Sequence, residues 1–302
     1  MELRRFLAIL TTALVIMLII AAWFFPLNED FRIENPLWNG AKDITASYPA
    51  RPLDSLSGLP TAPQGTTLIL IPYVNFTPIE LEQINRFVTD GGRLVIADDY
   101  GQGNQLLEHL GLKARFTGQT LLDPLINCQN EKLPRIIHLD KNNILTANTE
   151  SLAFNHATCL ENVTETNLLA SSSSFSFLDL NSNGIWEETE PTGPLPVISR
   201  HSLGQGQVIL ISDPSLLING MEAKEDNANF IQNMATTTTC LYIDQSHLPP
   251  SELHQTKHLL IQMRNLVATP LGTSVLVILA LVIVLKPIWH KRKEGLPGDP
   301  TS

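Results

Sequence analysis

Two long apolar blocks stand near the two ends of the chain. The first covers residues 6–27 and the second covers residues 266–285, and neither contains a charged side chain. A helix needs about 20 apolar residues to cross the hydrocarbon core of a bilayer. The pattern therefore predicts a transmembrane helix at each end. A cleaved signal peptide is the alternative for the first block, and a buried core helix is the alternative for the second.

Basic residues flank both apolar blocks on their outer sides. Arg4 and Arg5 precede the first block, and a cluster of lysines and arginine follows the second. Positively charged flanks stay on the cytoplasmic side of a membrane. We therefore expect a cell-membrane protein with two spans and both termini in the cytoplasm. In chain order we expect a cytoplasmic N-terminus over residues 1–5, an extracytoplasmic domain over 28–250, a helix next to the membrane over 251–265, and a basic cytoplasmic tail over 286–302.

Between the two blocks, apolar runs of strand length alternate with helical patterns. Thr67–Pro72 and Arg93–Ala97 are apolar on both faces, which is typical of central parallel strands. Thr77, Pro78 and Glu80 form a capping box in front of an amphipathic helix. We expect further strands over residues 135–139, 167–170, 195–199 and 206–212, and further helices over 105–110 and 226–235. This alternation predicts a layered α/β domain with a mostly parallel sheet.

The charge of the domain narrows the choice of partners. The formal net charge is −10 although both tails are basic, so the acidic excess lies in the domain between the spans. An acidic surface disfavours nucleic acid, which binds basic faces. The lipid bilayer, a membrane protein and divalent cations are partners that this charge allows.

The three cysteines form no metal-binding pattern. Cys128, Cys159 and Cys240 are far apart in the sequence, with no CxxC spacing. In an oxidising compartment, one pair could be bridged, for example Cys128 with Cys159. The equal alternative is that all three are small buried apolar residues.

The clearest chemical motif is a twelve-residue acidic loop that fits the calcium pattern D-x-[DN]-x-[DN]-G-x5-E. Calcium takes six to eight oxygen ligands in flexible geometry. The alternative is a tight Asn-Gly turn with exposed acids and no metal. In the calcium interpretation, oxygens come from the side chains of Asp179, Asn181 and Asn183, the carbonyl of Ile185, Glu187 directly or through water, and both oxygens of Glu190.

A second group of polar residues follows two predicted strands. Asp98 and Asp99 come directly after one strand, and Ser212 and Asp213 end another. Ligands of open α/β sheets bind beyond the carboxyl ends of the strands, so a polar or cation pocket is one interpretation. The other is that these side chains cap the following helices or accept from turn amides.

Several segments together resemble a known family. They are Ile84–Asp99, Gly103–Gly111, Phe177–Gly184, Glu190–Pro194 and Gly204–Ser215, with Asn35–Gly40 as the opening motif. They resemble the family called domain of unknown function 4350, found in membrane proteins. The resemblance implies a three-layer, flavodoxin-like fold similar to the class I glutamine amidotransferases, and it implies no established activity.

The positions that carry chemistry in such amidotransferases are changed in this chain. The corresponding strand-to-helix turn, Asp98–Leu107, contains no cysteine, and the later strand ends Ile211–Pro214 without a histidine. Covalent catalysis needs a nucleophile and a neighbouring base. We therefore expect no amidotransferase activity.

The functional expectation is a non-catalytic, membrane-anchored binding or scaffold module. Genes of the resembled family often neighbour those of a MoxR-type ATPase and a transglutaminase-like membrane protein, which implies an accessory role in an envelope complex. One alternative is a hydrolase or transferase with a rebuilt site around Asp98, Asp99 and Asp213. Another is a solute-binding subunit of a transporter.

Overall fold

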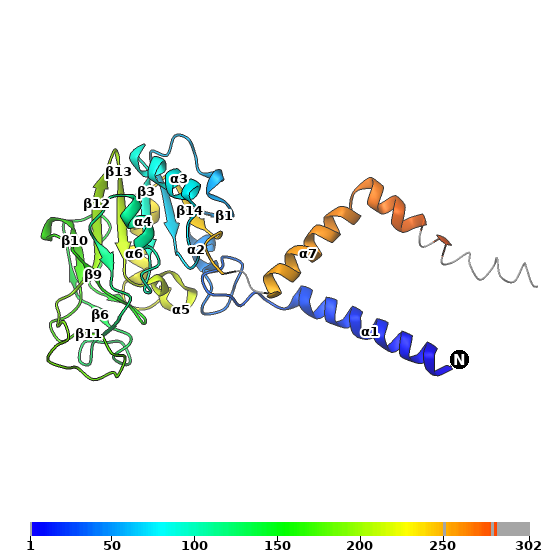
Figure 1. Ribbon diagram of the computed structural model, residues 1–302, viewed down its shortest axis with the longest axis horizontal. Helices are drawn as coiled ribbons and strands as arrows, with labels where there is room; N and C mark the ends of the chain where they lie inside the picture. Colours follow the sequence, from blue (N-terminus) through cyan, green and yellow to red (C-terminus); the bar gives the residue numbers. More distant parts are fainter. Residues whose placement is uncertain (1, 250–251, 279–280, 283–302) are drawn as a thin grey trace, which may run out of the picture. The chain divides into compact units, whose positions relative to one another are not determined.

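The computed structural model describes residues 2–249, 252–278 and 281–282 (Figure 1). The chain divides into two compact units. One unit is the domain over Pro26–Pro249, close to the expected range 28–250. The other comprises the two ends, Met1–Phe25 and Pro250–Ser302.

An eight-stranded sheet forms the centre of the domain. Its strand order is β1-β14-β2-β3-β13-β12-β10-β7. The first five strands run parallel to one another, and β12, β10 and β7 are added in antiparallel pairs, so the sheet is mostly parallel as expected. The strand bounds are β1 Ala50–Leu53, β14 Cys240–Asp244, β2 Thr66–Leu70, β3 Arg93–Ala97, β13 Gly206–Ile211, β12 Pro196–Leu203, β10 Leu168–Ser171 and β7 His138–Leu139.

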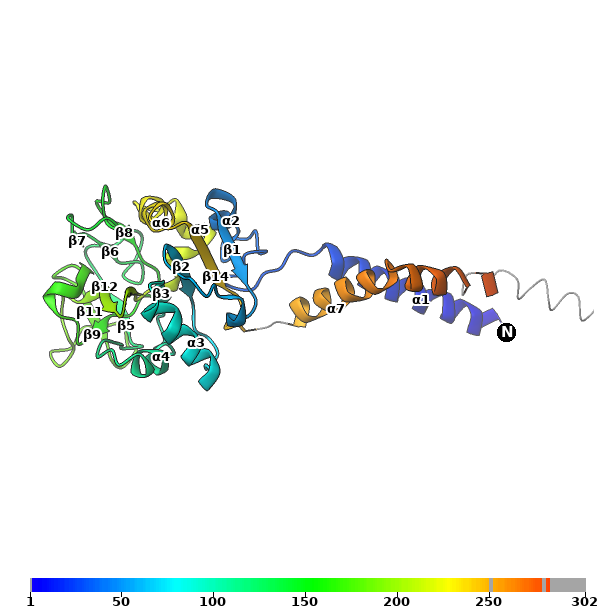
Figure 2. The same cartoon turned by 90° about the horizontal axis from the view of Figure 1, so that it is seen from above.

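Helices cover both faces of the parallel part of this sheet. Figure 2 shows α2, α5 and α6 on one face and α3 and α4 on the other. Alternate side chains of the central strands separate into two apolar cores, one with Ile69 and Val95 beneath α6 and one with Leu68 and Leu94 beneath α3. Burial on both faces explains why these strands read as continuous apolar runs. The helix bounds are α2 Lys42–Ser47, α3 Pro78–Thr89, α4 Asn104–His109, α5 Asn219–Glu222 and α6 Asn227–Thr236, with 3-10 turns η1 Leu56–Gly58, η2 Glu165–Asn167 and η3 Pro214–Leu217.

The predicted strand–helix–strand unit is confirmed in detail. The Thr77 side chain accepts from the Glu80 N–H, and the Glu80 carboxylate accepts from the Thr77 N–H at 2.8 Å. Pro78 opens α3, where its missing N–H costs no helical bond. β3 has the bounds expected from the sequence.

Two features of the sheet depart from the expected alternation. β14 pairs with β1 and β2, although its sequence was not predicted as a strand. A tight turn connects β12 to β13, so the two strands are antiparallel and no crossover helix lies between them. Gly204 in that turn has φ +58°, a conformation that glycine adopts without the cost other residues incur.

Short strand pairs fill the long segment between β3 and β12. They form three two-stranded sheets. The single strand predicted over residues 135–139 is divided, because β6 and β7 pair with different partners. The pairs are β4 Arg115–Phe116 with β9 Leu160–Glu161, β5 Thr120–Leu122 with β11 Phe177–Asp179, and β6 Arg135–Ile136 with β8 Leu152–Ala153.

The described residues of the two ends contain one helix apolar and long enough to span a membrane. Helix α1, Glu2–Phe24, carries this stretch over Leu3–Phe24, with no part of it buried. It ends just ahead of Pro26, which disfavours helical geometry in the residue before it. A signal anchor and a signal peptide share these properties, so both alternatives stand.

The second predicted span, over 266–285, falls partly outside the described residues, and the described residues show no second helix that is apolar and long enough to span a membrane. Helix α7, Glu252–Val267, overlaps the helix predicted over 251–265. It ends before Pro270, whose ring clashes with the helical carbonyl of the preceding turn. Residues 270–278 are helical again, and the rest of 266–285 lies largely outside the described residues, as does the tail over 286–302.

The capping box gives a test of the first βαβ unit. Replacing Thr77→Ala removes the side-chain acceptor of α3, and we expect the free energy of unfolding to fall by about 1 kcal/mol. Urea unfolding of the full chain in detergent measures this change. Thr236→Ala is the matched control, because its hydroxyl donates only to the Gln232 carbonyl on an exposed helix face. Equal effects of the two substitutions would contradict the capping role.

Candidate functional site

The carboxyl ends of β3 and β13 bring the four predicted edge residues together. The two strands pair in parallel with Ala97 opposite Ile211, and the Asp98 N–H donates to the Ile211 carbonyl at 3.0 Å. Asp98 and Asp99 therefore lie beside Ser212 and Asp213. Two neighbouring strands thus place three carboxyl groups and one hydroxyl at a single edge of the sheet.

Asp98 organises the turn between β3 and α4. Its side chain is buried, and its two oxygens accept from the N–H groups of Tyr100 at 2.9 Å, Gly101 at 3.0 Å and Gly103 at 2.7 Å. Burial raises its pKa, while the three N–H donors act in the opposite direction. These contacts match the capping interpretation of Asp98.

Asp213 has a similar structural role after β13. It is fully buried and accepts from the N–H groups of Asn155 and Ser215, each at 2.7 Å. Burial raises its pKa to about 8, and the charge of Asp99 adds to that rise. The neighbouring Ser212 hydroxyl is buried without a hydrogen-bond partner among the described residues. Asp213 thus holds the segment around Asn155 against the end of the sheet.

Asp99 differs from its neighbours because it faces a cavity. The cavity has a volume of about 180 Å³, and Asp99 is only partly buried. Burial, and then the charge of Asp98, raises the pKa of Asp99 to about 7. The carboxyl group therefore changes charge near neutral pH and is available to a ligand.

Aromatic and polar side chains from distant segments complete this cavity. Tyr73 and Tyr100 lie with their ring centroids 6.1 Å apart, and Trp38, Asp30 and His156 also line the space. Asn39 donates to the Asp30 carboxylate. Sequence reasoning found Asp99 but missed the other lining residues, because no local pattern links segments 30–39, 73–100 and 155–156. The Asn35–Gly40 motif was the sequence signal that came closest, because its Trp38 and Asn39 line the cavity.

None of the three thiols lies at the turn between β3 and α4. All three are free, so the Cys128–Cys159 bridge considered from the sequence is not formed. The two side chains have different neighbours, since Cys128 contacts Glu225 and Cys159 contacts Thr117. Burial raises the pKa of Cys159 to about 11, which disfavours the reactive thiolate. Cys240 opens β14 at the opposite edge of the sheet.

The calcium-like residues lie together on one loop after β11. The Asp179 carboxylate accepts from the N–H groups of Asn183 at 3.2 Å and Gly184 at 2.9 Å. The Glu190 carboxylate accepts from Leu180 at 2.9 Å and Glu187 at 3.0 Å. These bonds tie the start of the loop to its end. A strand precedes the loop and Pro191 follows it, so it is not a helix–loop–helix hand.

Three further side-chain oxygens of this loop, on Asn181, Asn183 and Glu187, accept from donors of the loop itself. Glu187 Oε1 accepts from the side-chain amides of Asn181 at 3.1 Å and Asn183 at 2.9 Å, and the Ile185 N–H donates to Asn183 Oδ1 at 2.7 Å. Within the described ranges, no group of three or more His, Cys, Asp or Glu residues is arranged to hold a metal. Calcium at Asp179–Glu190 therefore stays a prediction.

Taken together, the fold and the edge define a layered α/β domain with an acidic, aromatic cavity at the carboxyl ends of its parallel strands. The family described as domain of unknown function (DUF4350) matches residues 38–235. The chain belongs to this family. A comparison with curated proteins found no match.

Several solved structures are similar to part of this chain. The mmIFT52 N-terminal domain is 16% identical over 55% of this chain and 74% of its own length, with a TM-score of 0.43. A β-galactosidase from Bacillus circulans sp. alkalophilus is 14% identical over 56% of this chain, with a TM-score of 0.34, and the match spans only 22% of that enzyme. A putative ThuA-like protein from Bacteroides uniformis is 12% identical over 61% of this chain and 74% of its own, with a TM-score of 0.35. No functional property is carried over from them.

Replacing Asp99→Asn tests the electrostatics of the edge. The folded state binds this proton more tightly than the unfolded state, whose aspartate has a pKa near 3.9. In the wild type this group therefore lowers the free energy of unfolding as pH rises from about 4 to about 7. Asparagine does not ionise, so the variant should become more stable than the wild type as pH rises from 5 to 8. Thermal melting should show a stability difference on the order of 1 kcal/mol after solvent screening. Glu131→Gln, an exposed change, should leave the pH profile unaltered, and parallel profiles for Asp99→Asn and wild type would contradict this account.

Replacing Asp179→Ala tests the acidic loop. The Gly184 N–H loses its acceptor, whereas the Asn183 N–H keeps Asn181 Oδ1 at 3.0 Å. We expect a loss of about 1–2 kcal/mol in the free energy of unfolding, measured with urea on the full chain in detergent. Glu188→Ala is the control, because Glu188 is exposed in the same loop. The calcium prediction adds that millimolar calcium raises the melting temperature of the wild type relative to chelator, and does not do so in Asp179→Ala. Identical melting temperatures of the wild type with calcium and with chelator would contradict the prediction of calcium binding.

Proposed function

We propose that this chain is a non-catalytic, membrane-anchored binding module that docks a cationic group of a membrane-protein partner. The docking site is the cavity at the carboxyl edge of the sheet. Helix α1 would anchor the module in the membrane. The module would serve an envelope complex as an accessory component. The single observation that carries the proposal is the convergence of Asp30 and Asp99 with the side chains of one phenylalanine, one tryptophan and two tyrosines on one small cavity.

The chemistry of the lining favours a cation. Carboxylates attract an ammonium or guanidinium group, and aromatic faces such as those of Trp38, Tyr73 and Tyr100 add cation–π attraction of about 0.5–2 kcal/mol each. No lysine or arginine is among the described residues that line the cavity. A volume of about 180 Å³ suits a single side chain better than a drug-sized molecule, which needs roughly 300 Å³ or more.

The raised pKa of Asp99 supports the same class of ligand. The carboxyl group is held near half-ionisation at neutral pH by burial and by Asp98. A bound cation replaces the missing counter-charge and stabilises the ionised form. Cation binding should therefore release protons near pH 7 and strengthen as pH rises.

A rebuilt hydrolase or transferase site is the second candidate. The observation that favours it is that Asp99 has a pKa of about 7 and shares its cavity with His156, since general acids and bases work best with a pKa near the operating pH. Ser212 is buried, and Asp98 and Asp213 are engaged by backbone N–H groups, so Ser215 is the serine that lines the cavity with Asp99 and His156.

The test compares a charged probe with a neutral one. The full chain in detergent is titrated with an acetylated, amidated Gly-Lys-Gly peptide and with the norleucine analogue, by calorimetry at pH 6 and pH 8. We expect only the lysine peptide to bind, more tightly at pH 8, with affinity reduced about tenfold in Asp99→Asn because a charge-assisted contact is lost. Glu131→Gln should bind like the wild type. Equal binding of both peptides, or of wild type and Asp99→Asn, would refute the proposal.

A further inference from the structure

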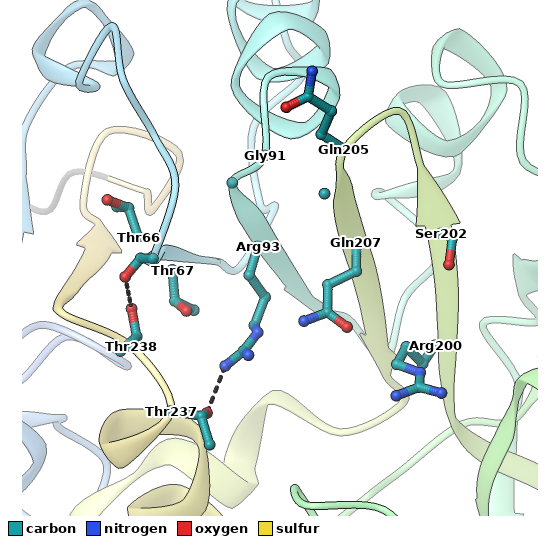
Figure 3. A pocket seen from close by; sticks show the side chains of 13 residues that line it. Thr66, Thr67, Gly91, Arg93, Arg200, Ser202, Gln205, Gln207, Thr237 and Thr238 are labelled. Carbon is teal, nitrogen blue, oxygen red and sulfur yellow. Dashed lines mark hydrogen bonds between the residues drawn. The ribbon is translucent and has the colours of Figure 1, made fainter.

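A second cavity lies at the opposite, amino edge of the sheet. It has a volume of about 400 Å³ and is drawn in Figure 3. Its thirteen lining residues include two arginines and neither aspartate nor glutamate, in a chain that carries 30 acidic and 20 basic residues. The local charge of this cavity is therefore opposite to the charge of the whole protein.

Strand register explains how the polar groups meet. Thr67 on β2 pairs with Arg93 on β3, Arg93 pairs with Gln207 on β13, and Gln207 pairs with Ser202 on β12. Residues opposite one another on neighbouring strands point to the same face of a sheet. In Figure 3 the Arg93 side chain lies between Thr67 and Gln207, and Arg200 lies beyond Gln207. Four strands thus present one continuous row of hydrogen-bonding groups to the cavity.

The Thr67 hydroxyl has no hydrogen-bond partner among the described residues, although the residue is only 1% exposed. A buried hydroxyl without a partner costs roughly 1–3 kcal/mol, so native structures seldom leave one unpaired. Thr67 is also one of the residues that line the cavity. A ligand atom that accepts a hydrogen bond there would satisfy this group.

Both arginines keep donors available to a ligand. Arg93 donates to Thr237 Oγ1 at 2.7 Å, and its Nε donates to the Gln207 amide oxygen at 2.8 Å in the amide orientation that satisfies both groups. That orientation leaves the Gln207 NH₂ as a further donor. Arg200 is exposed, and neither arginine forms an ion pair within the described ranges.

A purely structural role accounts for only part of this arrangement. Helix α6 ends beside Arg93, and a cation stabilises the partial negative charge of a helix C-terminus. This explains Arg93 and its bond to Thr237. It does not explain the unsatisfied Thr67 hydroxyl, and it does not involve Arg200, whose exposed guanidinium faces solvent and can meet an acceptor from outside the domain.

We infer that the amino edge of the sheet binds an oxyanion group, phosphate-like or carboxylate, through Thr67, Arg93, Arg200 and Gln207. Arginine guanidinium groups recognise such oxygens through paired N–H donors. The cavity volume lies in the range of small-molecule sites, so the oxyanion belongs to a small solute. The site is independent of the carboxyl-edge cavity, because it stands on the opposite ends of the same strands.

Two substitutions test the site without disturbing the contacts of Arg93. The full chain in detergent is titrated by calorimetry with inorganic phosphate and, separately, with acetate, at constant ionic strength set by chloride. Thr67→Val removes a hydroxyl that has no partner inside the domain, and Arg200→Gln removes an unpaired charge. We expect saturable binding of at least one oxyanion, weakened about threefold to tenfold by Thr67→Val and about tenfold or more by Arg200→Gln.

Matched controls separate this site from general charge effects and from the proposed cation cavity. Lys113→Gln removes an exposed positive charge elsewhere, and Asp99→Asn alters the other cavity. Both should bind the oxyanion like the wild type. Absence of saturable binding for both probes, unchanged affinity in Thr67→Val and Arg200→Gln, or an equal loss in Lys113→Gln would overturn the inference. The probe that binds with the higher affinity, phosphate or acetate, identifies the class of oxyanion.

Discussion

Burial of the parallel strands on both faces is the constraint on which the rest of the domain depends. The inner residues of β2, β3 and β13 are almost all below 2% exposure, and helices cover both sides. A polar side chain in that interior would need a buried partner for each donor and acceptor. Polar chemistry is therefore confined to the strand ends, and the sheet has two chemically distinct edges.

The direction of the helices divides charge between these edges. Each helix that follows a parallel strand begins at the carboxyl edge, where free N–H groups attract carboxylates, and runs back to the amino edge, where free carbonyls attract cations. Asp98 and Asp213 accept such N–H groups. Arg93 lies beside the end of α6. The fold itself thus accounts for acids at one edge and arginine at the other, before any ligand is considered.

Local signals in the sequence were enough for the first half of the sheet and for the edge carboxylates. The capping box, the glycines after α3 and the two apolar runs specify β2, α3 and β3 without help from distant contacts. β14 was not predicted because its apolar run, Cys240–Ile243, is only four residues long, and its place between β1 and β2 comes from tertiary pairing. The aromatic wall of the carboxyl-edge cavity was missed for a similar reason, since Trp38, Tyr73 and His156 meet only after folding.

The acidic loop shows why a motif match does not by itself define a site. A calcium pattern specifies oxygen-bearing residues at set spacings, and the same spacings suit a loop that satisfies its own N–H groups. Here Asp179 and Glu190 accept four backbone bonds between them. A carboxylate has about four lone-pair sites, so these bonds leave room for a cation and calcium at this loop stays a prediction.

Neighbouring residues at the carboxyl edge illustrate the distinction that matters for function. Asp98 and Asp99 follow the same strand, yet they differ in their contacts. The Asp98 carboxylate accepts from three backbone N–H groups, whereas Asp99 lines the cavity. Asp98 therefore fixes the turn that aims Asp99. The same division holds at the amino edge, where Arg93 is held by Thr237 and Gln207 and Arg200 is not. At each edge a satisfied residue builds the frame, and an unsatisfied one beside it is the group left to meet a ligand.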